Sequence, residues 1–584
     1  ECAESPYIID CVTALYAYQA VASIDADYAD PYVGLSDVYS LMVYYNYATR
    51  DEAIPKSKQY AETAKEKNPN LAKAYTSTGW ILHMFERDWS GAEENYKKAI
   101  ELNPNYATSR QWYALYLINV GRKTEALEMV KKAEQLDPTS MIIKSVLGLQ
   151  YQGVGEDELA LKFANKALEK NADWSQPNLL LASIYANNNQ IELAADYLLK
   201  VYDATNPEDV MGIEQIAKLY YTHGYYENAL YYFEKTLNYS NSKKRPNFIE
   251  NCRFAIQAIK NPINFNAKNI GELVNSPMTE YVNAITVDGK KLLFTRRIEA
   301  NQKRDQEDLF VFDIANNSVS PLPFNTSQNE GAITVSADGT MYVYTACDRV
   351  NSIGGCDLYI RQYSKENGWS KEYNLGENVN SNKWESQACF SPDGKYLYFI
   401  SNRPGGFGKE DIWRSEITKE GFMLAENLGS SINTNQIEMS PFLHPDNLTL
   451  YFASDGHIGM GDDDLFVSRR ANSQQVWGIP MNMGYPINTH NSENSLIVAS
   501  NGKTAYYTSD VSGFGKEDIF QFDLPKNLQA EPLAELELEI ITQQVGEEVI
   551  LKNVSFTSNS YELEKTSFVE FRPSSSITIS ACAT

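Results

Sequence analysis

The chain is 584 residues long, 43% hydrophobic and 12% aromatic, with a formal net charge of −25 at pH 7. This length predicts more than one folded domain, and we expect two large domains and a fragment of a third. So acidic a chain lacks the basic surface that nucleic-acid phosphates require, which excludes nucleic acid as an expected partner. It contains no run of about eighteen apolar residues, so the sequence predicts no membrane-spanning helix.

The start of the chain leaves two interpretations open. The sequence begins at Glu1 with no signal peptide, which is typical of a mature or trimmed form. Cys2 suits a lipid anchor only if Glu1 is absent from the native protein. The seven cysteines have no C-x-x-C spacing, so we predict no metal site.

A helical repeat runs from Ala29 to about Leu237. Alanines recur every 34 or 35 residues, at Ala92, Ala126, Ala160, Ala194 and Ala229. A second series of small residues lets paired helices approach closely, at Gly79, Ala114, Gly148, Ala182 and Ala217. The pattern resembles the tetratricopeptide repeat. It predicts an α-solenoid of six or seven helix pairs over residues 1–260, closed by a helix at Phe248–Ile259. The concave face of such a solenoid binds an extended peptide or a partner's helix.

The second half repeats with a period near fifty, and three series of residues stay in phase. The first marks a turn, at Asp288, Asp338, Asp393 and Asp446, with Asn501 in the fifth place. The second precedes an apolar or aromatic pair, at Asp308, Asp357, Asp411, Asp464 and Asp518. The third lies just upstream of the turn, at Glu280, Glu330, Glu385, Glu438 and Glu493. Several short strands in each unit of this length predict a five-bladed β-propeller over residues 261–527. The motif resembles the WD40-like repeat of TolB-type propellers.

We interpret the repeated aspartates as structural residues. An acid at the same place in every blade accepts backbone N–H bonds in a turn and locks one blade to the next. The run Asp462-Asp463-Asp464 suggests calcium, but it lacks the glycine and the distal glutamate of a calcium loop. We therefore expect no catalytic, cofactor or metal residues among them.

A disulfide is predicted between Cys347 and Cys356. Cys347 ends one strand of the second blade, and Cys356 directly precedes Asp357 at the next strand. The two face each other across the Gly354-Gly355 turn, at a distance that a disulfide spans. The alternative is a pair of buried free thiols.

Residues 528–584 begin with a linker strand and continue into Val545–Ser567, a stretch that resembles the opening of the OmpA-like peptidoglycan-binding domain. That family grips the peptide of peptidoglycan with an aspartate and an arginine. Where the aspartate is expected, this sequence has Ala581-Cys582-Ala583-Thr584. The resemblance therefore implies an incomplete domain here, and peptidoglycan binding only through a complete one.

The order of the three modules resembles a group of periplasmic proteins of Bacteroidetes, which includes the peptidoglycan-tethering lipoprotein of the type IX secretion system. The resemblance implies a periplasmic, outer-membrane-associated protein. It would act as a non-catalytic scaffold that links a secretion or gliding machine to the cell wall through contacts with other protein subunits.

The alternative is a soluble propeller that senses a sugar or a peptide, since Trp384, Trp413 and Trp477 could stack sugars. An enzyme is not expected. The G-x-S-x-G elbow of hydrolases is absent, and five histidines are scattered, at His83, His223, His444, His457 and His490.

Overall fold

The computed structural model describes residues 8–531, except 45–46, 170, 204–208, 238–247, 299–305, 474 and 511–512. The chain divides into two compact units. The first is helical and holds the residues up to Leu219 together with 235–237. The second holds Tyr220–Glu234, the last helix and all of the strands. The Val545–Ser567 stretch and Cys2 lie outside the described residues.

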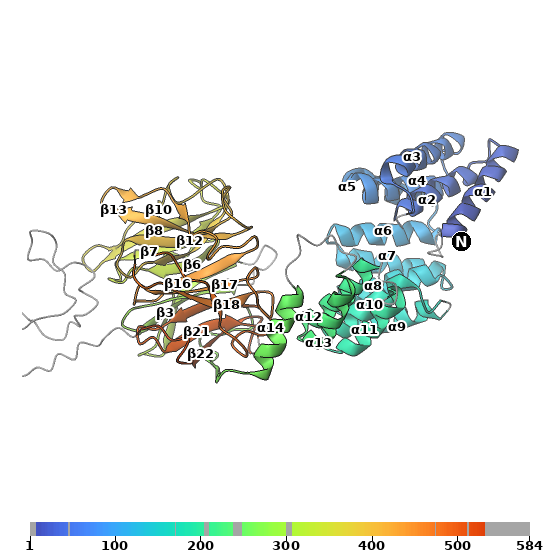
Figure 1. Ribbon diagram of the computed structural model, residues 1–584. Coiled ribbons are helices and arrows are strands. Elements are labelled where there is room, and N and C mark those ends of the chain that lie inside the picture. Colours follow the sequence, from blue (N-terminus) through green and yellow to red (C-terminus); the bar gives the residue numbers. More distant parts are fainter. Residues whose placement is uncertain are drawn as a thin grey trace, which may run out of the picture. The chain divides into compact units, whose positions relative to one another are not determined.

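Fourteen α-helices and one π-helical turn precede the strands in the described part of the chain (Figure 1). They are α1 (Ile8–Ile24), α2 (Asp30–Tyr44), α3 (Arg50–Lys67), α4 (Ala72–Ile81), η1 (Leu82–Glu86), α5 (Trp89–Leu102), α6 (Ala107–Asn119), α7 (Lys123–Leu136), α8 (Met141–Gly153), α9 (Asp157–Leu168), α10 (Ser175–Asn187), α11 (Ile191–Val201), α12 (Val210–Thr222), α13 (Tyr226–Lys235) and α14 (Phe248–Lys260). From α2 to α11 consecutive helices pack as five pairs, which confirms the predicted helical-repeat fold of this region. None of the helices in the described part is long and apolar enough to cross a membrane.

The small residues of the sequence pattern lie where two helices of a pair touch. A Cβ atom added at Gly79 would come within 3.0 Å of the Tyr96 ring on the next helix. At Gly148 it would lie 2.9 Å from Leu180 and 3.3 Å from the main-chain oxygen of Ala160. Such distances leave no room for a larger side chain, so these residues set the spacing of the helices.

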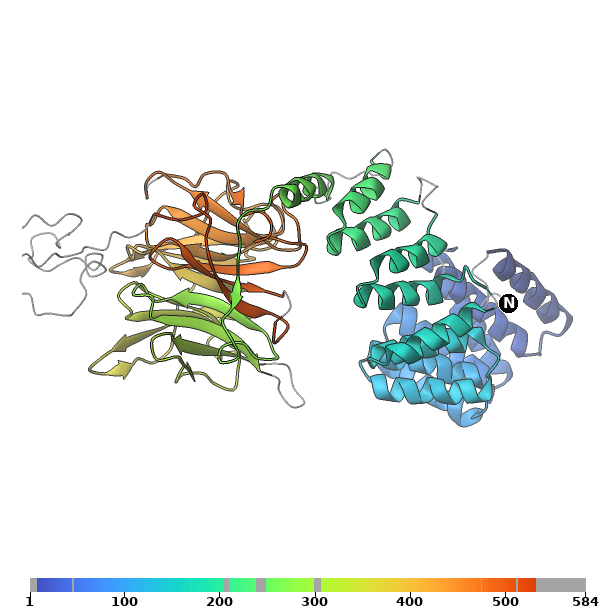
Figure 2. The same cartoon turned by 90° about the horizontal axis from the view of Figure 1, so that it is seen from below.

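Five antiparallel sheets follow and form the blades of a propeller (Figure 2). Blade one holds β2 (Glu280–Ile285), β3 (Lys291–Ile298), β4 (Gln306–Asp313) and β5 (Ser318–Pro321). Blade two holds β6 (Glu330–Val335), β7 (Met341–Cys347), β8 (Cys356–Ser364), β9 (Gly368–Trp369) and β10 (Tyr373–Asn374). Blade three holds β11 (Glu385–Phe390), β12 (Tyr396–Ser401), β13 (Asp411–Thr418), β14 (Gly421–Phe422) and β15 (Glu426–Asn427).

Blade four holds β16 (Glu438–Leu443), β17 (Thr449–Ser454), β18 (Asp464–Arg469) and β19 (Met481–Asn482). Blade five holds β20 (Glu493–Val498), β21 (Thr504–Ser509) and β22 (Asp518–Asp523), and its outer strand is β1 (Lys268–Asn269). Lys268 pairs with Gln521 and Asn269 with Phe520, so a strand that precedes blade one completes blade five. The predicted count of five blades is thereby confirmed.

Apolar side chains pack between neighbouring blades. Tyr398 and Ile412 of blade three share one buried cluster with Phe452 and Phe466 of blade four. The cluster between blades four and five also takes in Leu528 and Ala530, which follow the last strand. The Tyr451 hydroxyl donates to the Leu528 carbonyl over 2.7 Å. Residues after the predicted propeller boundary at 527 therefore belong to its core.

Candidate interaction sites

In blades two to five, the aspartate at the start of the third strand holds the loop before it. In blade three, Asp411 accepts from the main-chain N–H groups of Phe407 at 2.5 Å and Gly408 at 2.9 Å. The Asn427 side chain donates to the same carboxylate over 2.7 Å. Equivalent main-chain N–H groups donate to Asp357, Asp464 and Asp518. Asp308 receives the Gln306 side chain at 2.9 Å, and most of the loop before it lies outside the described residues.

The acids of the first turn play a second local role. Asp393 accepts from the Lys395 N–H at 3.2 Å and from the Ser391 hydroxyl at 2.7 Å. The same bond from the N–H two residues later forms at Asp288, Asp338, Asp446 and Asn501. An amide oxygen accepts this bond as well as a carboxylate oxygen does, which explains why asparagine serves in blade five. These two sets of residues hold turns in place.

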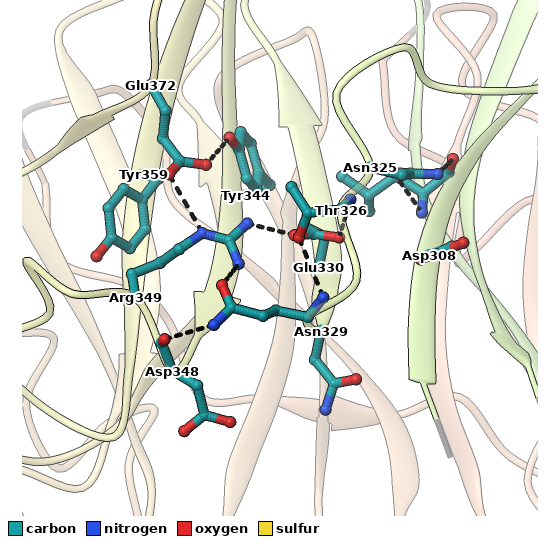
Figure 3. Close-up of polar contacts among 12 residues, drawn as sticks. Asp308, Asn325, Thr326, Asn329, Glu330, Tyr344, Asp348, Arg349, Tyr359 and Glu372 are labelled. Carbon is teal, nitrogen blue, oxygen red and sulfur yellow. Dashed lines mark hydrogen bonds and ion pairs between the residues drawn. The ribbon is translucent and has the colours of Figure 1, made fainter. Parts of the chain in front are cut away.

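The glutamates that open each blade are fully buried, and their partners divide the propeller into two groups. In blades one to three an arginine pairs with the glutamate: Arg296 with Glu280, Arg349 with Glu330, and Arg403 with Glu385. Figure 3 shows the blade-two example, where Arg349 also bonds Glu372 over 3.2 Å. In the described residues no lysine or arginine pairs with Glu438 or Glu493 of blades four and five.

Burial without a cation changes the protonation of the two unpaired glutamates. Glu438 accepts from the Thr434 N–H, the Thr434 hydroxyl and the Ser454 hydroxyl, at 2.7, 2.6 and 2.8 Å. Desolvation outweighs these bonds and raises the pKa of Glu438 to about 7. It raises the pKa of Glu493 to about 8. Both side chains therefore keep their proton to a higher pH than an exposed glutamate does.

The solenoid contains one site that the sequence analysis missed, at the end of α4. From the small residue of the first helix to the alanine of the second, four repeats count 12 residues, but Gly79 to Ala92 counts 13. The extra residue is absorbed by the π-helical turn η1, which places His83 inside the helix pair. The uneven count was visible in the sequence and is the signal that could have located this turn.

Aromatic rings surround His83. Its ring centre lies 5.5 Å from Tyr116, 5.9 Å from Trp89 and 6.0 Å from Trp80. The His83 Nε2 atom is 2.7 Å from the Asn119 amide, whereas Nδ1 has no partner in the described residues. Burial lowers the pKa of His83 to about 4, so the imidazole is neutral at pH 7. Trp89 is the exposed member of the group.

The first helices of the pairs line the inner side of the solenoid. The Gln176 amide of α10 donates to the Tyr44 hydroxyl of α2 over 3.2 Å, although three helix pairs lie between the two helices. This contact requires that the solenoid curve with its first helices inside. Gln152 of α8 donates to the Ser183 hydroxyl of α10 over 3.0 Å, and Leu179 is exposed one turn away. The inner face is therefore uncharged here and rich in groups that bond a peptide backbone.

The propeller channel is narrow. The first strands of all five blades line one cavity of about 30 Å³ and a second of about 50 Å³. A water molecule needs roughly 10–15 Å³, so these spaces fit a few waters and not a sugar ring. Trp413 and Trp477, which the sequence suggested as sugar platforms, are buried in blades three and four.

Two other sequence alternatives can be placed. Asp464 of the acidic run accepts loop N–H groups, and Asp463 accepts from the Ser492 hydroxyl at 2.7 Å. Within the described residues no group of three acids, histidines or cysteines is arranged to hold a metal ion. Cys347 and Cys356 form a disulfide that joins β7 to β8.

Comparisons with known proteins concern the helical part of the fold. The tetratricopeptide repeat family model matches residues 95–128. The TPR repeat-containing protein MJ1428 of Methanocaldococcus jannaschii is 27% identical over 224 residues, which is 36% of this chain and 36% of that protein. Tetratricopeptide repeat protein 6 of Homo sapiens is 24% identical over 180 residues, 30% of this chain and 32% of its own length. The chain thus spans about a third of the length of these relatives.

Among solved structures, PilF of Pseudomonas aeruginosa is 20% identical with a TM-score of 0.29, covering 37% of this chain and 94% of that one. PilW, a type IV pilus biogenesis factor, is 21% identical with a TM-score of 0.28, covering 35% and 95%. The repeat period, the helix pairs and the matched family model together show a helical region that is similar to tetratricopeptide repeats, with the family model itself matching residues 95–128.

Proposed function

We propose that this protein is a non-catalytic scaffold whose solenoid binds a segment of a partner protein. The inner face of the first helices carries the proposal, because Gln152, Gln176 and Ser183 place uncharged donors and acceptors beside the exposed Leu179. Amide and hydroxyl groups of this kind bond the main chain of a bound peptide, and an apolar neighbour accepts one of its side chains. A tetratricopeptide solenoid presents such a face along its whole length.

We further propose that the scaffold works in the periplasm at the outer membrane, and that it joins a secretion or gliding machine of the type IX class to the cell wall. Two observations support this location and role. Disulfides such as Cys347–Cys356 form and persist in oxidising compartments. The module order, with repeats, propeller and an OmpA-like stretch, resembles the periplasmic family named above. Peptidoglycan itself would be held by a complete OmpA-like domain.

Affinity capture from envelope fractions tests the proposal. The intact chain, the Leu179→Asp variant and a matched Leu136→Asp variant are compared as baits; both leucines are exposed to a similar degree, and Leu136 ends a second helix. We expect secretion or motility subunits with the intact chain and with Leu136→Asp, and a loss of about tenfold or more with Leu179→Asp. Because a buried carboxylate in an apolar contact costs several kcal/mol, a loss of this size is the minimum for a direct contact.

Capture of no envelope protein by the intact chain would contradict the scaffold function. It would favour the alternative of a sugar- or peptide-sensing propeller. Equal capture by both variants would keep a scaffold but remove its partner from the inner face of the solenoid.

A further inference from the structure

One end of the propeller carries a repeated loop, between the second and third strands of each blade. In four of these loops an apolar residue stands directly before a glycine: Ile353, Phe407, Met460 and Phe514. The N–H of each apolar residue donates to the aspartate that opens the third strand, at 2.5 or 2.6 Å. The four loops therefore present this residue from the same backbone arrangement.

The glycine that follows locks each loop against the next blade. A Cβ atom at Gly408 would lie 2.2 Å from the Gln436 carbonyl oxygen, and one at Gly515 would lie 2.0 Å from that of Met278. Gly354 and Gly461 have the same close contact with a following-blade carbonyl, at 2.0 and 2.1 Å. A larger residue would clash with this carbonyl, so the glycine fixes the path of the backbone that carries the apolar residue.

In blade four the chain covers this loop with its own helices. The Tyr226 hydroxyl of α13 donates to the Met460 carbonyl over 2.9 Å. The Gly459 N–H donates to the Asn251 side chain of α14 over 3.3 Å, and the Asn251 amide donates to the Tyr221 hydroxyl over 3.2 Å. Met460 is 0% exposed under this cover. A helical hairpin with an aromatic hydroxyl thus occupies the blade-four loop.

The equivalent loops of the neighbouring blades are open. Phe407 of blade three is 52% exposed and Phe514 of blade five is 45% exposed, and no side chain in the described residues donates to their carbonyls. An exposed lysine follows each of these loops, Lys409 and Lys516, where blade four has Asp462. We call each of these loops, with its apolar residue, a socket. The socket of blade four is therefore covered by helices, whereas the sockets of blades three and five are open and carry a lysine.

We propose that the loops of Phe407 and Phe514 dock an amphipathic α-helix of a partner protein, in the manner in which α13 and α14 cover Met460. The partner helix places an apolar or aromatic face on the phenylalanine, a hydroxyl donor on the loop carbonyl, and an aspartate or glutamate near the lysine. The two sockets continue an interface that already exists in the chain, because blades three and five flank blade four. The proposal deepens the scaffold function, on which it rests, by adding a second docking surface.

Site-specific photocrosslinking in cells tests this surface. A benzophenone amino acid replaces Phe407 or Phe514 in the full-length chain, and replaces Val350, a fully exposed apolar residue of the blade-two loop outside this frame, as the control. Crosslinked peptides are then sequenced by mass spectrometry. We expect both phenylalanine positions to crosslink to a helical, acidic segment of another protein at least tenfold more than Val350 does. Lys409→Glu and Lys516→Glu in the same chains should reduce the yield several-fold.

Crosslinks to a second copy of this chain, to a glycan, or to an extended segment would overturn the proposal, as would equal yields at Val350. Both phenylalanines are largely exposed, so their replacement leaves the fold intact, which circular dichroism verifies. Partner capture by the solenoid is measured in the same cells by comparing the intact chain with the Leu179→Asp variant. Loss of the propeller crosslinks with intact solenoid capture rejects this surface alone, whereas loss of both rejects the scaffold function.

Discussion

Replacing Glu438 by glutamine should make the propeller more stable at alkaline pH, although the change removes a charge from a repeated buried position. The glutamate opens blade four and has no cation partner in the described residues. A glutamine oxygen can accept the Thr434 N–H as the carboxylate does. Its amide can donate to the Thr434 and Ser454 hydroxyls, which rotate to accept. The hydrogen-bond network is therefore kept while the titration is removed.

The sign follows from the direction of the pKa change. In the unfolded chain this carboxyl loses its proton near its ordinary pKa of 4.5, and in the fold it keeps the proton until about 7. The folded state binds more protons between these values, so its stability falls as the pH rises through them. At about 1.4 kcal/mol per pKa unit, the loss for Glu438 is about 3 kcal/mol once the pH exceeds 7. Glu438→Gln should recover most of it.

Urea unfolding at about pH 5 and about pH 8, followed by tryptophan fluorescence, measures the effect. The free energy of unfolding of the wild type should fall by about 2 kcal/mol more than that of Glu438→Gln over this range. Glu385→Gln is the matched control, because the same position in blade three is paired with Arg403 at 3.2 Å. Its loss leaves a buried guanidinium without a counter-ion, which should destabilise the propeller by about 3 kcal/mol or more at both pH values.

An unchanged pH dependence in Glu438→Gln would refute the reasoning, since it would mean that the carboxyl ionises in the fold as it does in water. The reasoning would also be refuted if Glu438→Gln were less stable than the wild type and its free energy of unfolding changed with pH as that of the wild type does. We expect the free energy of unfolding of Glu438→Gln to be equal to or lower than that of the wild type near pH 5, and higher than that of the wild type near pH 8.

Three further expectations concern the loops of the same propeller. Gly354→Ala should destabilise the propeller by about 2 kcal/mol or more in urea unfolding, because its Cβ would lie 2.0 Å from a carbonyl of the next blade, whereas Gly355→Ala should be nearly neutral with nothing within 4 Å. Reduction of the Cys347–Cys356 disulfide, or its replacement by serines, should cost about 2–3 kcal/mol, and mass spectrometry without reductant should find the pair lighter than the free thiols by two hydrogen atoms. Tyr226→Phe should increase hydrogen exchange in α13 and α14 and cost about 1 kcal/mol, because the hydroxyl is the donor to the blade-four loop.

Most of the fold can be predicted from the periodicity of the sequence. The 34-residue spacing of alanines located the helix pairs, and the phased aspartates and glutamates located the five sheets. Such features can be predicted because each repeat must bury its faces against a copy of itself, so the same residue types return at the same places. The Phe248–Ile259 helix was found for a related reason, since its apolar residues recur with a helical period.

Features that break the repeat were harder to foresee. The arginine partners of Glu280, Glu330 and Glu385 stand 16, 19 and 18 residues downstream, out of phase with one another, so no spacing reveals them. Strand β1 has only two residues, and its role depends on where the ring closes. The cover over Met460 comes from residues more than two hundred positions earlier in the chain. Long-range contacts of this kind leave no local pattern in a sequence.

Strand β1 has a consequence for the order of events during synthesis. The ring is joined by a strand made before blade one and a strand that ends at Asp523, so the last sheet cannot form until nearly the whole propeller has left the ribosome. Tetratricopeptide pairs fold from contacts between neighbours and can form as they emerge. The propeller, by contrast, keeps unpaired strand edges at β1 and β21 until β22 has been synthesised. A premature stop anywhere before residue 518 would leave that edge unpaired and exposed to other chains.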